Sequence, residues 1–566
     1  MSSLKQPLGW SDFMMSTNLR EGITKEMDSN IRKRKRAFQK NKRKMGLGHQ
    51  GRRRTDVLSN REKWISSWAV LQVIFLAWNL GSMHIWAQWG NLGLSILALM
   101  GLLIPDDTAL NRTGFRGVGR LFSSPLFWFG GLLMGYIGIQ CVNSSFRYER
   151  YVPEVTIREV IQEGVISSDN PGEEDETKIV PLYPTASQVG QSQWHLLPSE
   201  QKYKLFPASV EAPFEKMNAT RTLLMFSPVW IWGCVLTLGI DRRRGLRRIL
   251  WAAVLGGSLM AFLGAIQRLT DAKGIYWFIS SSNPDFFGSF IYPNHAAAYL
   301  YLLLAMTLGL ALYHHQRSEQ EFLRSGPHYF LGFLAVLLVL GLVFSKSRAG
   351  IVLGSVVGIV CGSVIILRIL GRGQDMRQGM VLGILSVVGI GFLGYSVMNF
   401  TDIGGILTDF ETLKNPNSPS LETRLTLQQA TWEAFLKNKW YGTGAGSFQY
   451  RFPFSQMNYP ELGEVGKRYY THAHNDYLQV LMEYGLVGAS LITGFFTFLI
   501  WSAVKSVFLR PAMLTCFLTG LGVFALHSWW DFPGYCPSVL ILVVFMLAIM
   551  GRWGEAERIK LRIDNE

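Results

Sequence analysis

The chain has 566 residues, of which 49% are hydrophobic, 17% are charged and 57 are glycine. Charged residues are confined to a few blocks between long apolar stretches, which excludes an array of soluble domains and is typical of a polytopic helical membrane protein. The net charge is +15, and residues 1–63 hold 17 Lys and Arg against 6 Asp and Glu, so +11 of it precedes the first apolar stretch.

Residues 1–65 are predicted to form a disordered cytoplasmic arm. Its basic runs, such as Arg32-Lys33-Arg34-Lys35-Arg36, suggest a segment that binds nucleic acid. No aromatic residues interleave them, however, and no nucleic-acid-binding fold is recognisable. We therefore predict that the arm contacts anionic membrane lipids, to which each basic residue contributes about 1 kcal/mol, and that nucleic acid is not a partner.

Twelve apolar stretches approach the roughly 20 residues that a helix needs to cross a bilayer. They are 66–86, 89–104, 125–142, 222–240, 249–268, 295–313, 329–345, 349–370, 379–398, 485–508, 512–530 and 536–552. With the arm inside, the basic connections 105–124, 241–248, 314–328 and 371–378 all fall on the cytoplasmic side, as the positive-inside rule requires.

The predicted fold is thus an all-α bundle of about twelve transmembrane spans with both termini cytoplasmic. Residues 66–142 form three spans, 222–398 six and 485–552 three, and 553–566 are a cytoplasmic tail. The same alternation places 143–221 and 399–484 outside the membrane. The first of these segments contains short alternating stretches such as Val155-Thr156-Ile157, which suggest a small subdomain, but its sequence indicates no chemistry.

The second outer segment combines a predicted helix, a glycine run and a histidine pair. Leu421, Leu425, Trp432 and Leu436 follow one another at helical spacings. The run Gly442-Thr443-Gly444-Ala445-Gly446-Ser447 resembles a phosphate-binding loop but lacks its lysine and preceding strand, which favours a tight turn. The segment closes on Thr471-His472-Ala473-His474-Asn475-Asp476, where histidine offers a proton acceptor near neutral pH.

Polar residues in three other connections between spans are expected on the same outer side of the membrane as the histidine pair. They are Asn294 with His295, the cations Lys346 and Arg348, and His527 with Asp531. Arg424 stands at the head of the predicted outer helix. Ionisable groups at membrane depth are costly and usually face a polar cavity or a partner. Two alternatives stay open: Arg348 as an interface anchor, and His527 as a hydrogen-bonded histidine of the bundle.

Arginine beside a candidate base suggests an anionic substrate held by the membrane. A guanidinium binds phosphate oxygens through a rigid fork and stabilises a departing pyrophosphate, while histidine takes the proton of an incoming hydroxyl. These two roles describe glycosyl transfer from a lipid diphosphate. No metal is expected, because no pair of outer carboxylates has ligand-like spacing with the histidines, although Asp476 is adjacent. No cofactor is expected either.

These motifs resemble the O-antigen ligase-like superfamily of bacterial membrane proteins, which includes O-antigen ligases, O-antigen polymerases and O-oligosaccharyltransferases. The resemblance covers roughly residues 65–550 without 143–221. It depends on Gly288–His295, Ser347-Arg348-Ala349-Gly350, the segment from Arg424 to His474-Asn475 and Glu483-Tyr484-Gly485-Leu486, and His527-Ser528-Trp529-Trp530-Asp531-Phe532.

The resemblance implies metal-independent transfer of a glycan from undecaprenyl diphosphate to an acceptor hydroxyl at the periplasmic face of the bacterial inner membrane. It makes His474 the essential histidine, His472 secondary, and Arg348 and Arg424 the diphosphate ligands. Asn475, Asn294, His527 and Asp531 are supporting candidates, and Arg451 and Arg468 stay in reserve.

The acceptor is left open: lipid A-core for a ligase, another repeat unit for a polymerase, or a protein. A lipid or polysaccharide transporter is the alternative from another class. Transporters often show internal repeats and paired broken helices near the midplane, and the sequence indicates neither.

Overall fold

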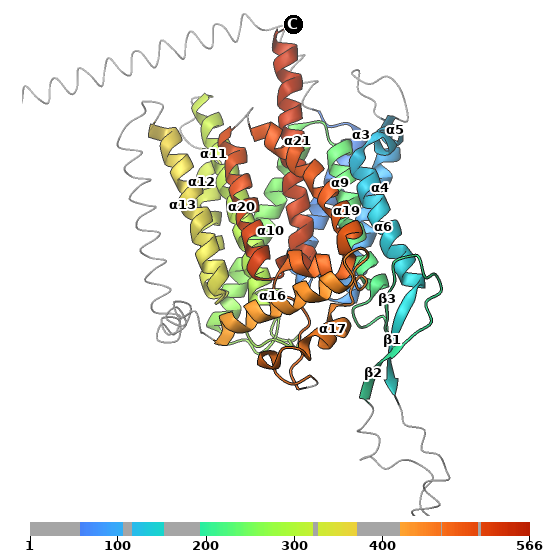
Figure 1. Ribbon diagram of the computed structural model, residues 1–566. Coiled ribbons are helices and arrows are strands. Elements are labelled where there is room, and N and C mark those ends of the chain that lie inside the picture. Colours follow the sequence, from blue (N-terminus) through green and yellow to red (C-terminus); the bar gives the residue numbers. More distant parts are fainter. Residues whose placement is uncertain are drawn as a thin grey trace, which may run out of the picture.

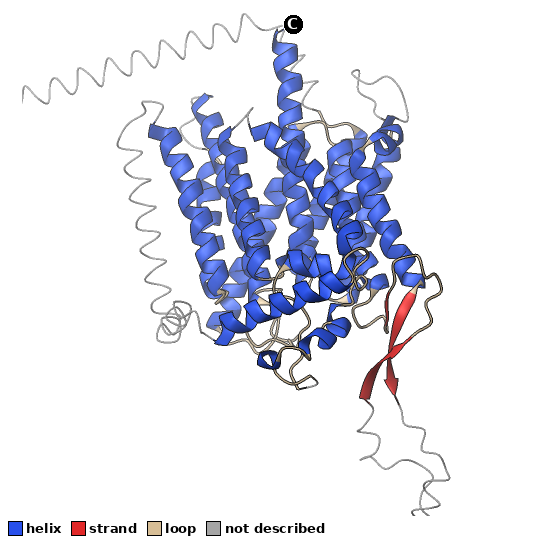
Figure 2. Cartoon of the chain, viewed as in Figure 1, coloured by secondary structure: helices blue, strands red, loops and turns tan. Residues whose placement is uncertain are grey.

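Long apolar helices make up most of the residues that the computed structural model describes, which are 57–105, 116–151, 193–320, 326–370, 419–465, 467–507 and 511–565. Figure 2 shows these helices standing side by side, with strands only at one corner. The helices of the bundle are α3 (Asn60–Trp78), α4 (Ile85–Met100), α5 (Arg116–Ser123), α6 (Pro125–Val142), α9 (Ala219–Gly239), α10 (Arg243–Leu269), α11 (Pro293–Gln320), α12 (His328–Phe344), α13 (Arg348–Leu370), α19 (Asp476–Val507), α20 (Pro511–Trp530) and α21 (Pro537–Asn565).

The predicted membrane-spanning bundle is confirmed. Nine helices of the described part of the chain are long and apolar enough to cross a membrane, and α12 is a shorter apolar helix. The predicted span 379–398 lies outside the described residues, so the number twelve stays a prediction. α11 and α21 form the centre of the bundle, with 83% and 89% of their apolar windows buried.

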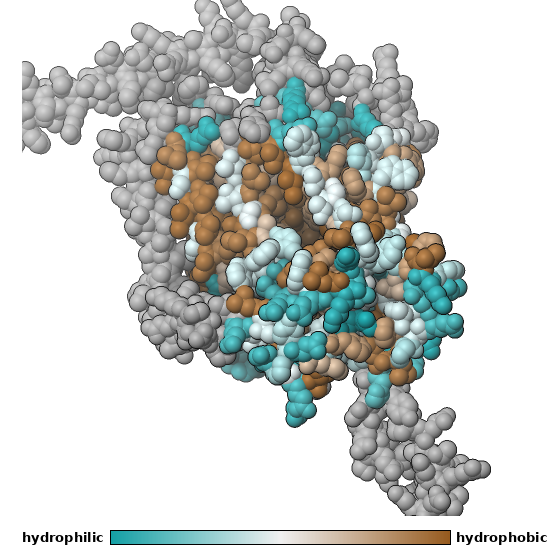
Figure 3. All heavy atoms as spheres, in the orientation of Figure 1, coloured by the Kyte–Doolittle hydropathy of each residue, from teal (hydrophilic) through white to brown (hydrophobic). Residues whose placement is uncertain are grey.

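The two ends of the bundle differ. Figure 1 places α16 (Pro419–Lys437), α17 (Phe448–Arg451) and the strands at one end, which we call the site end, and the C-terminal part of α21 at the other. In Figure 3, apolar residues form a broad band along the helices, and hydrophilic residues gather around α16 at the site end.

The first helix is displaced from its predicted position. The sequence predicts a span at 66–86, but α3 begins at Asn60 and ends at Trp78. A capping box of Ser59 and Glu62 starts the helix early. Left-handed backbone at Leu80, Gly81 and Ser82 then separates α3 from α4. Hydropathy alone misses this start because the first turn carries charged residues.

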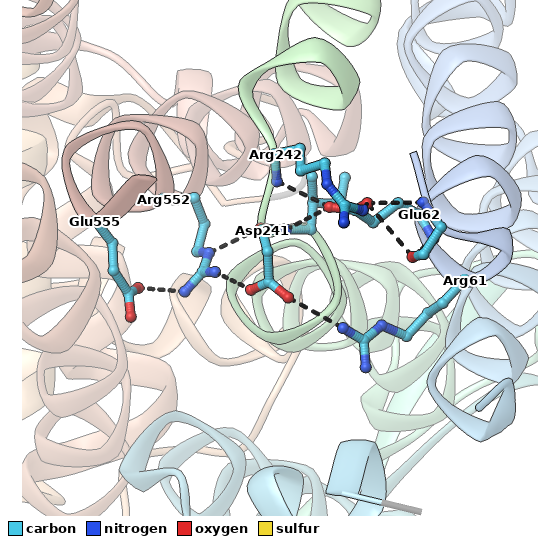
Figure 4. A network of polar contacts seen from close by, with 8 residues as sticks. Arg61, Glu62, Asp241, Arg242, Arg552 and Glu555 are labelled. Atoms are coloured by element: carbon cyan, nitrogen blue, oxygen red, sulfur yellow. Dashed lines mark hydrogen bonds and ion pairs between the residues drawn. The ribbon is translucent and has the colours of Figure 1, made fainter. Parts of the chain in front are cut away.

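Two of those charged residues, Arg61 and Glu62, belong to an ionic network at the end opposite the site end (Figure 4). Glu62 accepts the backbone N–H groups of Asp241 (2.9 Å) and Arg242 (2.8 Å) and pairs with the Arg242 side chain. Asp241 bridges Arg61 (3.1 Å) and Arg552. The network fastens α3, the α9–α10 connection and α21 together, and removing one partner would leave a costly unpaired buried charge.

At the site end, α16 lies across the bundle and is followed by the short helices α17, α18 (Pro453–Gln456) and η3 (Pro460–Leu462). The predicted helix is thus present, but three of the residues quoted for its helical spacing lie on its exposed side. Leu425, Trp432 and Leu436 are 47%, 43% and 51% exposed. The buried face is made by Leu427, Ala430, Ala434 and Phe435 instead. Because both faces of α16 carry apolar residues, helical spacing alone does not indicate which face packs against the bundle.

A three-stranded sheet in the order β2-β1-β3 interrupts the otherwise helical fold within 143–221. β1 (Ser144–Tyr151) pairs antiparallel with β2 (Gln193–Pro198) and parallel with β3 (Ser209–Glu211). The stretch Val155-Thr156-Ile157 lies outside the described residues. Ser209 Oγ donates to the carbonyl of Ala445 at 2.9 Å, which ties the sheet to the glycine run of the second outer segment.

Candidate active site

Four helix ends meet at the site end around the loop Thr471–Asn475. The loop leads directly into α19, while Asp531 directly follows α20, Asn294 lies in the first turn of α11, and Ser347 directly precedes α13. Residues far apart in the sequence are thereby brought within hydrogen-bonding distance.

His474 and Asp531 form the centre of this arrangement. His474 Nδ1 lies 3.2 Å from Asp531 Oδ1, and 33% of the His474 side chain is exposed against 4% for Asp531. Burial alone would raise the pKa of Asp531. The hydrogen bond from His474 and the charges of His474, His527 and Arg424 outweigh burial and hold this pKa well below its usual range. Asp531 is therefore an ionised acceptor, and we assign the Nδ1 proton of His474 to this hydrogen bond, with Nε2 left as an acceptor.

A relay of polar side chains holds the second oxygen of Asp531. Asn294 Nδ2 donates to Asp531 Oδ2, and Ser347 Oγ donates to Asn294 Oδ1 at 2.7 Å. The Gly350 N–H in turn donates to Ser347 Oγ at 3.0 Å. Three separate sequence motifs thus join in one chain of hydrogen bonds across α11, α13 and α20, which fixes the orientation of the carboxylate toward His474.

The backbone of His474 is held in an uncommon conformation. Its φ is +49°, in the left-handed region that non-glycine residues rarely adopt. Gln428 Nε2 of α16 donates to the His474 carbonyl at 3.4 Å, so α16 helps to hold the loop. Strained backbone of this kind clusters at functional sites, where the surrounding structure must stabilise it.

His472 has a different environment. Its ring stacks on Phe532, with centroids 4.1 Å apart and planes inclined by 11°, and Nδ1 lies 3.3 Å from Gln479 Oε1. Burial, followed by the charge of His295, lowers the pKa of His472 to about 3. His472 is therefore neutral at physiological pH and packs the loop against Phe532, whose ring also lies 5.1 Å from that of His474.

The remaining supporting candidates have structural partners. Asn475 Oδ1 accepts the Leu478 N–H at 3.1 Å and so caps α19. His527 is 1% exposed, with Nδ1 3.2 Å from the Tyr301 hydroxyl and Nε2 3.9 Å from Asp531 Oδ2. It thus lies behind Asp531, between the carboxylate and the bundle core.

The arginines are placed unequally around this centre. Arg424 Nη1 donates to the Trp530 carbonyl at 3.2 Å, beside Asp531, whose pKa its charge lowers. Arg348 is exposed and begins α13 directly after Ser347, at the end of the hydrogen-bond relay. The reserve candidates lie over aromatic rings: the Arg451 guanidinium is 4.1 Å from the Phe146 centroid, and that of Arg468 is 5.7 Å from Tyr470.

The glycine run forms the predicted tight turn. Gly442, Gly444 and Gly446 have φ values of +71°, +105° and +69°, which glycine adopts without strain. The amides of Gly446 and Phe448 donate to the carboxylate of Glu483 at 3.3 and 3.1 Å. These amides are therefore already occupied by a side chain and do not form a phosphate-binding loop.

Sequence reasoning overlooked Glu483 and Phe532 as individual residues. Glu483, buried in α19, also accepts the Tyr535 hydroxyl at 2.9 Å and so joins the glycine turn to the α20–α21 connection. At Gly485, two residues further on, α19 has a non-helical backbone with φ of +60°. Glu483 and Phe532 lie within the motifs quoted from the sequence, but spacing alone does not indicate which residues they contact.

Residues 333–493 match a family model described as O-Antigen ligase. The match runs from α12 to the middle of α19 and includes Arg348, Arg424, His472 and His474, whereas Asn294 and Asp531 lie outside it. No curated protein matches the chain. The family match confirms the resemblance to the O-antigen ligase-like superfamily, whose members are membrane glycosyltransferase-like enzymes that use glycan and lipid-linked substrates.

Proposed function

From the O-antigen ligase match at residues 333–493, we propose that this multi-pass membrane protein transfers a glycan from a polyprenyl diphosphate to an acceptor hydroxyl. The observation that carries the proposal is the ionised Asp531 beside His474, oriented by Asn294 and Ser347 and lying next to Arg424. A candidate base and cations meet at one end of a membrane bundle, where a lipid-held diphosphate would lie.

In the proposed mechanism, His474 is the general base. Asp531 accepts the Nδ1 proton, so Nε2 is free to take the proton of the acceptor hydroxyl. The hydroxyl oxygen attacks the anomeric carbon of the glycan, a new C–O bond forms, and the bond between that carbon and the diphosphate oxygen breaks with its electron pair on the leaving group. Asp531 stabilises the imidazolium that results.

Arg348 and Arg424 are proposed to bind the diphosphate and to stabilise the charge that develops on it as it leaves. Both stand close to the polar relay, Arg348 through its neighbour Ser347 and Arg424 through Trp530. The proposed steps require no metal and no cofactor. His472 is proposed to position the loop through Phe532 and not to transfer the proton.

An apolar groove supports a lipid-linked donor. A cavity of about 770 Å³ between α6 and α19 is lined by Phe129, Leu481, Leu486, Thr493 and Trp501, among others. At 1.5 Å per residue, the helical lining beyond Gly485, from Leu486 to Trp501, extends about 22 Å, most of the roughly 30 Å thickness of a bilayer core. The polyprenyl chain is proposed to lie there, with its diphosphate toward the start of α19.

We propose the bacterial inner membrane as the location, with the site end periplasmic and both termini cytoplasmic. The lipid A-core, another glycan and a protein are alternative acceptors. The test is in vitro transfer by the purified protein from a polyprenyl-diphosphate-linked glycan to each of these acceptors. Transfer to one of them is expected; hydrolysis or transport of the donor without transfer to any acceptor would contradict the proposal and favour the transporter alternative.

A further inference from the structure

A second groove lies at the end of the bundle opposite the site end. It has a volume of about 480 Å³ and is lined on α10 by Arg244, Arg247, Arg248, Trp251, Ala252 and Leu255, with Val70 of α3 and His314 of α11 opposite. The α10 residues recur at intervals of three and four, so they form one continuous stripe on that helix. We call this the arginine groove.

The arginines of the groove lack the carboxylate partners that their neighbours have. Arg242 pairs with Glu62 and Arg243 with Glu557. Within the described part of the chain, Arg244, Arg247 and Arg248 form no ion pair. Arg247 donates only to the Tyr313 hydroxyl (3.3 Å) and Arg248 to Ser66 Oγ (3.5 Å). Three positive charges therefore line one groove without a compensating negative charge from any described residue.

The polarity of the groove changes along its length. The arginines come first, the indole of Trp251 follows, and Leu255, 42% exposed, lies furthest from the helix start. Trp251 Nε1 donates to His314 Nε2 at 3.3 Å, which fixes the indole between the charged and the apolar parts. At 1.5 Å per residue, Arg244 and Leu255 are about 16 Å apart along the axis.

Charge, aromatic ring and apolar wall follow the same order as the headgroup, interface and acyl chain of a phospholipid. Leu259 and Phe262, further along α10, are 56% and 48% exposed, so this side of the helix continues as an apolar surface at membrane depth. A free anion would use the arginines but would have no use for the apolar wall.

We propose that the arginine groove is a binding site for an anionic phospholipid. The lipid phosphate lies between Arg244, Arg247 and Arg248, and one acyl chain runs along Ala252 and Leu255. The bound lipid supplies the negative charge that the described part of the protein does not provide there. This site is separate from the glycan-transfer site and does not depend on the proposed function.

The test compares lipid retention by purified full-length protein in detergent, using native mass spectrometry. The probes are dioleoylphosphatidylglycerol and, as the zwitterionic control, dioleoylphosphatidylcholine. The groove variant is Arg244→Gln/Arg248→Gln, which changes two exposed residues. The matched control, Arg120→Gln/Arg368→Gln, removes the same charge from α5 and α13 outside the groove.

The wild type is expected to retain phosphatidylglycerol in preference to phosphatidylcholine. The groove variant should lose this retention about tenfold, because two cations near an anionic headgroup are removed. The control variant should retain the lipid as the wild type does. Equal retention by groove variant and wild type, or equal retention of both lipids by the wild type, would overturn the proposal. Displacement of the lipid by inorganic phosphate alone would also overturn it, in favour of a site for free anions.

Discussion

The substitution Asp531→Asn preserves the size of the side chain but is expected to slow glycan transfer strongly. Both carboxylate oxygens act as acceptors. Oδ2 accepts from Asn294, while Oδ1 accepts the Phe532 amide at 3.0 Å and faces His474 Nδ1 at 3.2 Å. An asparagine offers one oxygen and one NH₂ group. In either orientation, its NH₂ group therefore meets a donor, from Asn294 or from His474.

The magnitude follows from these contacts. A hydrogen bond to a charged group contributes about 1.5–3 kcal/mol, which corresponds to roughly 10- to 150-fold in rate when it is lost in the transition state. An NH₂ group facing His474 would also require the tautomer with the proton on Nε2, the atom proposed to act as base. General-base catalysis typically contributes about 10²–10⁴-fold. We expect transfer to slow about 10²-fold or more.

The assay is single-turnover transfer of a labelled glycan by purified protein, with thermal unfolding as the check on folding. The control is Asp285→Asn, because Asp285 is an aspartate in the connection before α11 whose side chain is 59% exposed. The control should transfer at the wild-type rate. A folded Asp531→Asn protein whose rate stays within about threefold of wild type would refute the role assigned to the carboxylate.

Arg348→Lys keeps the charge but loses the bidentate fork, so we expect at least about a tenfold loss of transfer with normal membrane insertion; unchanged transfer would make Arg348 an interface anchor. EDTA is expected to leave transfer intact, because the proposed steps use only protein side chains; activity that is lost and returns with Mg²⁺ or Mn²⁺ would contradict this. Burial, followed by the charge of His295, lowers the pKa of His472 to about 3, so below about pH 6.5 the folded protein binds fewer protons than the unfolded chain. Stability should therefore fall as the pH falls from about 6.5 toward 3. The loss per pH unit is at most about 1.4 kcal/mol, and less here because His472 is partly exposed. Thermal unfolding of His472→Gln should depend less on pH than that of the wild type, and equal dependence would argue against a neutral His472 in the folded protein.

The sequence predicted the bundle well because hydropathy reports directly on membrane spans. It failed where helix ends depend on tertiary contacts. α3 begins within the predicted arm because the capping box of Ser59 and Glu62 starts the helix there, and because Glu62 pairs with Arg242 across the bundle. Which face of α16 is buried depends on what packs beneath the helix: Leu427 and Phe435 are buried, whereas Leu425 and Trp432 are exposed.

The site residues could be found individually, but their connections could not. Asn294 and Asp531 are 237 positions apart, and no spacing rule relates residues of different helices. The sequence grouped His472 with His474 because they share one motif. The resemblance ranked His474 above His472, but only packing shows how they differ: the His472 ring is stacked on Phe532, and the His474 ring is hydrogen-bonded to an ionised carboxylate.

The most direct test of the general-base role is single-turnover glycan transfer by His474→Gln across pH. Glutamine keeps a hydrogen-bonding side chain but takes up no proton at the pH values of the assay. The transfer rate is expected to fall by about 10²–10⁴-fold with donor binding largely intact. The decrease of the transfer rate at low pH that is expected for the wild type should be absent from the variant. A His474→Gln protein that transfers glycan at the wild-type rate, with an unchanged pH profile, would contradict the general-base role and leave His474 as a positioning residue.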